Sequence, residues 1–228
     1  TNSLNLKYKY MSNIKKLINL LGQLSEKEED RIKWLSIIDF NGNEAYNFSL
    51  SHGMSSLICF FSKLYYYEDF KEDVHILLKG SISYILSRKL NNIESISLFP
   101  SIELKDKKSI INSRLSWCYG DLGIALAIWN ASKALKVIKL KEIALDIFKH
   151  ASNRKSREDN FVNDSSICHG AFGIAKIFHR IYKETDIENF KITAEYWLGE
   201  GLEMANHSDG FAGFMQFEPN ELKENEWK

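Results

Sequence analysis

The chain has 228 residues, of which 44% are hydrophobic and 26% are charged, proportions that are ordinary for a globular protein. Its 30 basic and 30 acidic residues balance to a formal net charge of zero, which argues against nucleic acid or an anionic membrane as a partner bound through bulk charge. No apolar run is long enough to cross a membrane, and the first residues lack the apolar core of a signal peptide.

Only two prolines are present, and a low proline content favours an all-α fold because long helices are left uninterrupted. Apolar residues recur at spacings of three and four, which predicts amphipathic helices. In chain order, these stripes cover residues 14–21, 57–65, 74–85, 124–131, 138–148, 174–181 and 190–202. Residues 91–112 alternate weakly and contain a proline, so we expect a long connection there, and the polar residues 150–166 predict a second loop.

Short glycine-bounded sequences recur where helices are expected to begin. Glycine relieves crowding where a chain turns into a helix close to a neighbouring backbone. Such motifs can recur by chance, but four similarly placed copies favour a repeat of helix hairpins, packed as a solenoid or a closed ring. The copies are Gly53-Met-Ser-Ser56, Gly120-Asp-Leu-Gly123, Gly170-Ala-Phe-Gly173 and Gly210-Phe-Ala-Gly213.

Three cysteines without an export signal fit the reducing cytoplasm, where thiols serve as core, metal-binding or catalytic groups. Cys118 and Cys168 occupy matching places in two repeats, and His169 is adjacent to Cys168. Two thiolates and an imidazole suit Zn²⁺, and three protein ligands leave a fourth position open, as in catalytic zinc sites. From spacing alone, the alternative is that both cysteines are small buried hydrophobic residues.

The surrounding motifs carry a more specific signal. Residues 117–123 read WCYGDLG and residues 168–174 read CHGAFGI, with LSHG ahead of them at 50–53. In this order and spacing they resemble the lanthionine synthetase C-like family, the LanC cyclases of lanthipeptide biosynthesis. The resemblance extends from about Tyr46 to Gly213.

This resemblance implies an α/α-toroid, in which an inner ring of helices is wrapped by an outer ring. It also implies one catalytic zinc at one end of the barrel, held by Cys118, Cys168 and His169. Members of the family are about twice as long as this chain. We therefore expect residues 1–228 to form the C-terminal part of a single LanC-like α/α-barrel domain, so that the toroid is incomplete.

The resemblance assigns further roles near the metal. His52 matches an active-site histidine that transfers protons without binding zinc, and Tyr119 and Arg114 match residues beside the site. On position alone, His52 could cap a turn, Tyr119 could be a half-buried aromatic residue, and Arg114 could be a surface charge. Asp121 is interpreted as a first-turn acid favoured by the helix dipole rather than as a catalytic group.

The implied activity is that of a zinc-dependent lanthionine cyclase. A peptide cysteine thiol adds to a dehydroalanine or dehydrobutyrine of the same peptide and forms a thioether ring, with His52 as the general acid. The implied partners are a dehydrated precursor peptide and a dehydratase of the same pathway. Two alternatives stay open: addition of glutathione to dehydroamino acids, and a non-catalytic scaffold that binds peptide.

The remaining candidates are predicted to be structural. Cys59 lies on an apolar helix face and is expected in the core. The sequence lacks both a phosphate-binding glycine loop and a Gly-x-Ser-x-Gly elbow. Four histidines without partners at metal-ligand spacing are expected to be surface or hydrogen-bonded residues: His75, His150, His179 and His207.

Overall fold

The computed structural model describes residues 2–37, 44–91, 95–105, 112–219 and 225–227. Within these residues the protein is mainly helical, as the apolar periodicity predicts. The helices are α1 (Asn2–Leu24), α2 (Met54–Leu64), α3 (Glu68–Ser87), α4 (Asp121–Leu135), α5 (Ile138–Ser152), α6 (Ala171–Thr185) and α7 (Glu188–Glu203).

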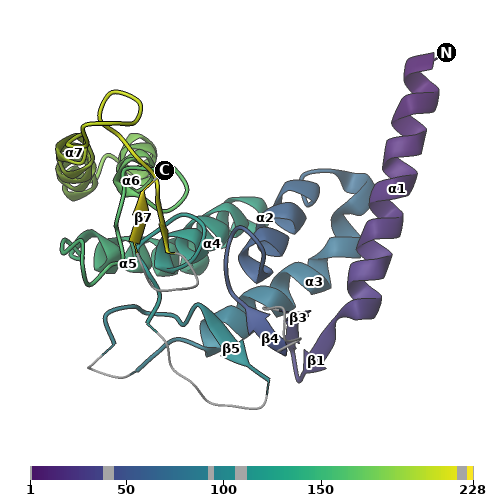
Figure 1. Cartoon of the computed structure of the whole chain (residues 1–228). Coiled ribbons are helices and arrows are strands. Elements are labelled where there is room, and N and C mark those ends of the chain that lie inside the picture. Colours follow the sequence, from purple (N-terminus) through teal and green to yellow (C-terminus); the bar gives the residue numbers. More distant parts are fainter. Residues whose placement is uncertain (1, 38–43, 92–94, 106–111, 220–224, 228) are drawn as a thin grey trace.

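Six of these helices form three successive hairpins, α2–α3, α4–α5 and α6–α7. The last two hairpins turn through a residue in the left-handed conformation, Lys136 after α4 and Asp186 after α6, each with φ of 56°. Helix α2 packs against α4, and α5 contacts α7, so the hairpins follow one another in an arc. In Figure 1, α1 and the α6–α7 hairpin lie at opposite ends of this arc.

Helix α4 lies at the centre of the packing. Its small and aliphatic residues are buried on nearly all sides, from Asp121 to Trp129 without interruption. A helix that is apolar all round is typical of a fully enclosed position. Aromatic rings join the neighbouring helices: Phe148 of α5 lies 6.5 Å from Phe178 of α6 and 6.2 Å from Phe190 of α7, measured between ring centroids.

Short antiparallel strands, which the periodicity does not predict, complete the fold. Strands β1 (Glu26–Glu28) and β2 (Arg31–Lys33) pair, and β4 (Glu44–Asn47) lies between β3 (Leu35–Ile37) and β5 (Ile102–Leu104). Near the other end, β6 (Phe217–Pro219) pairs with β7 (Asn225–Trp227). Strand β5 lies in the expected connection at 91–112, of which residues 92–94 and 106–111 are outside the described residues. Helix α5 extends to Ser152, so the loop predicted at 150–166 begins slightly later.

The prediction that a helix begins at Gly210–Gly213 is wrong. Gly210, Ala212 and Gly213 have φ of 88°, 55° and 82°, and a bridge between Phe211 and Phe214 closes the turn. Left-handed residues in such close succession cannot start a right-handed helix. The chain continues into β6 instead.

None of the helices in the described parts of the chain is both long enough and apolar enough to cross a membrane.

Candidate metal centre

Helices α2, α4 and α6 are each preceded by a turn of the same construction. In each turn, a serine four residues before the glycine accepts a hydrogen bond through Oγ from the backbone N–H of the residue just before the glycine. This bond holds the side chains at the tip of the turn in a defined place. The donor and acceptor pairs are His52 and Ser49, Tyr119 and Ser116, and His169 and Ser166, with N···O distances of 3.0, 3.2 and 3.4 Å.

The glycine of each turn is required by the close approach of the chain to itself. A Cβ atom added at Gly53, Gly120 or Gly170 would lie 2.3, 2.0 or 2.4 Å from the carbonyl oxygen of the residue six positions earlier. Such distances are far shorter than van der Waals contact, and Gly120 also has φ of +128°. These glycines therefore build the turns rather than only punctuating the helices.

Backbone hydrogen bonds join the three turns to one another. The N–H groups of Leu50 and Ser51 donate to the carbonyl oxygen of Cys118, at 2.9 and 3.4 Å. The N–H of Cys118 in turn donates to the carbonyl oxygen of Cys168, at 3.4 Å. The beginnings of α2, α4 and α6 consequently meet at the same end of the three hairpins.

Cys118, Cys168 and His169 come together at this end. One ligand atom from each, the two Sγ atoms and a ring nitrogen, lies within 4.8 Å of the others. Cys118 is buried, His169 is half-buried and Cys168 is exposed, so the cluster opens to solvent on the side of Cys168. Among the described residues, this is the only cluster of His, Cys, Asp and Glu side chains with such spacing, and it could bind a metal ion.

The cluster favours a thiolate. Burial raises the pKa of Cys118, but hydrogen bonds with His169, Ser116 and Cys168, together with the positive charge of Arg114, lower it to about 7. Contacts with Asp164 and Cys118 raise the pKa of His169 to about 10. The buried carboxylate of Asp164 lies 3.3 Å from His169 Nε2, and this contact lowers the pKa of Asp164 despite burial.

A cavity of about 650 Å³ adjoins the cluster, and His169, Arg114 and Tyr119 all line it. Arg114 is half-buried and donates from Nη2 to the carbonyl oxygen of Phe161. Phe161 itself has φ of 54°, a conformation that costs a non-glycine residue energy and often marks a functional site. The cavity therefore offers a cation and a phenol beside His169 of the cluster.

The chain is similar to known proteins both in sequence family and in fold. A family-level comparison matches residues 2–208 to the lanthionine synthetase C-like proteins. The chain belongs to this family. Among solved structures, nisin cyclase is similar with a TM-score of 0.65 and 20% sequence identity. The match covers 86% of this chain and 52% of nisin cyclase, so the chain spans about half the length of that protein; a search of curated proteins found no match.

The similarity to nisin cyclase supports the prediction of an all-α, toroid-like fold for this lanthionine synthetase C-like chain. The hairpins then correspond to consecutive units of the double ring, with α2, α4 and α6 following the glycine turns. Each of the first three glycine turns starts a helix, as predicted, and all three converge on one end of the hairpins.

The proposed proton donor of this family member lies apart from the cavity. His52 is exposed, its ring centroid is 6.3 Å from that of Tyr119, and it is not among the residues that line the cavity. Tyr119 is near both, since its ring is tilted by 47° against that of His52 and its side chain also borders the cavity.

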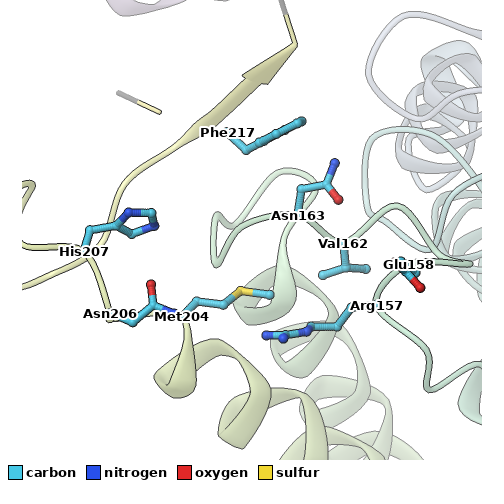
Figure 2. A pocket seen from close by; sticks show the side chains of 8 residues that line it. All are labelled: Arg157, Glu158, Val162, Asn163, Met204, Asn206, His207 and Phe217. Atoms are coloured by element: carbon cyan, nitrogen blue, oxygen red, sulfur yellow. The ribbon is translucent and has the colours of Figure 1, made fainter. Parts of the chain in front are cut away.

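Figure 2 shows a second cavity, of about 490 Å³, between the loop after α5 and the end of α7. Asn163 and Phe217 line both this cavity and the one beside the metal cluster. Arg157, Glu158 and Asn206 make the second cavity more polar. The two cavities thus adjoin across Phe217, which comes from the start of β6.

The residues that the sequence predicts to be structural lie outside the metal cluster. Asp121 lies in the first turn of α4, as expected, and it is also fully buried and paired with Arg154. Cys59 is half-buried against the core, as expected, and accepts a weak hydrogen bond from Asn130. His75 contacts the Tyr65 hydroxyl, His150 contacts the Ile96 carbonyl, His179 is exposed, and His207 borders the second cavity.

Sequence reasoning missed the serine of each turn and Asp164. The serines left a signal, because Ser49, Ser116 and Ser166 all stand four residues before a glycine. The fourth glycine motif, at Gly210–Gly213, has Asn206 at that position, and no helix follows it. Asp164 left no such signal, because the equivalent residues in the other two turns are Asn47 and Arg114.

Proposed function

We propose that this chain carries the zinc site of a lanthionine cyclase, which closes thioether rings in a dehydrated precursor peptide. The observation that carries the proposal is the convergence of Cys118, Cys168 and His169, from two different hairpins, within 4.8 Å. Membership of the lanthionine synthetase C-like family and similarity to nisin cyclase support the reaction type. We also propose that residues 1–228 are the C-terminal part of one such α/α-barrel domain, that a dehydratase supplies the substrate, and that both act in the cytoplasm.

The donor set fits Zn²⁺, since two thiolates and one imidazole are ligands that this ion prefers. Cys118, Cys168 and His169 would hold it, and the exposed side of Cys168 leaves access for a substrate sulfur. When bound, zinc would lower the pKa of a peptide thiol and so keep it as a thiolate near neutral pH.

The other side chains of the site would handle the peptide. Addition of sulfur to the β-carbon of a dehydroamino acid places negative charge on the adjoining carbonyl oxygen. The guanidinium of Arg114, in the cavity beside Cys118, is suited to stabilise that charge. His52 would then deliver a proton to the α-carbon, and Tyr119, between His52 and the cavity, would orient the peptide or relay the proton.

Ring closure can be measured by mass spectrometry after the protein is mixed with a dehydrated, cysteine-containing peptide. A thiol-blocking reagent then adds mass only to peptides whose thiol has stayed free. We expect the unaltered chain to contain zinc and to protect the thiol. Cys118→Ala and Cys168→Ala should lose both properties, whereas Cys59→Ala, which removes the cysteine away from the cluster, should keep them.

The same experiment separates the alternatives. Ring formation that persists in Cys118→Ala or Cys168→Ala would contradict the proposal. If glutathione is included, a peptide that gains the mass of one glutathione while its own thiol stays free would favour the alternative reaction, addition of a small thiol. Peptide binding without zinc and without either product would favour a scaffold.

A further inference from the structure

We propose that Asp164 is a positioning residue of the zinc site. It holds the imidazole of His169 by Nε2, so that Nδ1 is the ring nitrogen that faces the thiols of Cys118 and Cys168. The inference rests on the proposed function, because it concerns how that same site binds its metal.

The carboxylate of Asp164 is itself firmly held. Its side chain is only 1% exposed. Oδ1 accepts a hydrogen bond from the N–H of Ser166 at 2.9 Å, and Oδ2 accepts one from the N–H of Phe217 at 3.0 Å. Oδ2 also lies 3.3 Å from His169 Nε2, so a fixed acceptor stands against one edge of the ring.

The two ring nitrogens of an imidazole point in different directions. When one nitrogen is hydrogen-bonded to a carboxylate, the other points away from that carboxylate and is free to bind a metal. Histidines that bind metals usually donate their second N–H to such an acceptor, which fixes both tautomer and orientation. In this turn the acceptor comes from five residues before the histidine and belongs to the same loop. The turn therefore orients its own metal ligand.

The other turns show that building this loop does not require a carboxylate. Asn47 occupies the equivalent position ahead of His52, and its Oδ1 accepts a hydrogen bond from the N–H of Ser49 at 2.9 Å, as Asp164 does from Ser166. Asn47 therefore supplies the same turn without a negative charge. The additional feature at Asp164 is its second oxygen, which faces His169.

These observations define the test. Asp164→Asn should keep the turn, because Asn47 builds one, but its single acceptor oxygen cannot serve both Ser166 and His169. We expect zinc affinity, measured by competition with a chromophoric chelator, to fall about 10- to 100-fold. The midpoint temperature of thermal unfolding should be nearly the same for the zinc-free Asp164→Asn variant as for the zinc-free unaltered chain.

A matched pair controls for damage to the turn. Serine can also accept the local N–H, so Asp164→Ser and Asn47→Ser perturb equivalent turns in the same way. Only Asp164→Ser should weaken zinc binding. Equal affinity in the unaltered chain and in both Asp164 variants would overturn the inference, as would an equal loss in Asn47→Ser.

A spectroscopic measurement gives an answer that does not depend on the variants. Long-range ¹⁵N–¹H NMR on the zinc-loaded chain should show His169 with its proton on Nε2 and with zinc on Nδ1. The opposite arrangement would overturn the inference and leave the metal site intact. An unaltered chain that binds no zinc would instead overturn the proposed function, and the positioning role with it.

Discussion

The buried ion pair between Asp121 and Arg154 should be one of the most sensitive points of the fold. Asp121 is fully buried at the first turn of α4, and Arg154 Nη1 lies 3.0 Å from its Oδ2, with the Arg154 side chain only 4% exposed. The N–H groups of Leu98 and Phe99 donate to the same carboxylate at 2.9 and 3.1 Å. One side chain thus joins α4, the loop after α5 and the connection before β5.

Asp121→Ala would strand a buried cation and leave two backbone donors without an acceptor. Breaking a buried pair from one side costs about 3–5 kcal/mol, most of it from the charge left without compensation. Arg154→Met added to the same variant removes that charge, so the double variant should recover part of the loss. Arg154 also donates to Asn160 and to the carbonyl oxygen of Ser113, so recovery should be incomplete.

Urea unfolding followed by circular dichroism measures these changes as differences in the free energy of unfolding. Glu142→Ala is the control, because it removes the exposed Lys139–Glu142 pair of α5 and should cost less than about 0.5 kcal/mol. A loss in Asp121→Ala as small as that of the control would refute the reasoning. The reasoning would also be refuted if adding Arg154→Met to Asp121→Ala lowered the free energy of unfolding by as much again as Arg154→Met does alone.

Three further predictions concern stability. At Gly120, φ is +128° and an added Cβ would lie only 2.0 Å from the Arg114 carbonyl oxygen, so Gly120→Ala should lower the free energy of unfolding in urea by more than about 2 kcal/mol. Gly199 lies in an open part of α7, so Gly199→Ala should raise the free energy of unfolding by about 0.5–1 kcal/mol. Burial raises the pKa of Glu184, but bonds from Lys133, Trp129 and Arg180 lower it to about 2. Because the folded pKa is below the unfolded value of 4.5, this stabilisation is present above pH 4.5 and is lost as the pH falls toward 2; Glu184→Gln should flatten the pH dependence in that window, and an unchanged slope would contradict the assignment. Phe178→Ala, at the centre of the rings joining α5, α6 and α7, should cost about 3–5 kcal/mol in the same assay, and a loss below about 1 kcal/mol would show that these rings contribute little.

The helices could be predicted because apolar residues recur along them at spacings of three and four. Each apolar stripe in the sequence corresponds to a helix in the structure, and the glycine turns before α2, α4 and α6 are where the motifs place them. From the residues alone the metal cluster was one of two alternatives, since two cysteines from separate hairpins match no compact ligand spacing, and the family resemblance favoured it. Its geometry depends on backbone bonds between turns, such as Cys118 N–H to the Cys168 carbonyl oxygen.

What could not be predicted depends on tertiary contacts. At Gly210–Gly213 the glycine spacing is the same as in other turns, but the backbone is left-handed and the following residues pair as a strand. The partner of Asp121 is distant in the chain, and the local pattern of a first-turn acid gave no sign of Arg154. The role of Asp164 could not be predicted from the sequence either, because its carboxylate comes close to His169 only in the folded turn.

The hydrogen bond from Cys118 to Cys168 crosses the boundary between the α4–α5 and α6–α7 hairpins. A metal ion held by side chains from both turns would link the two hairpins across that boundary, in addition to the backbone hydrogen bond. Removal of the metal by a chelator should then weaken the contact between the two hairpins before either hairpin unfolds. Metal occupancy would therefore measure how completely the ring of hairpins has assembled.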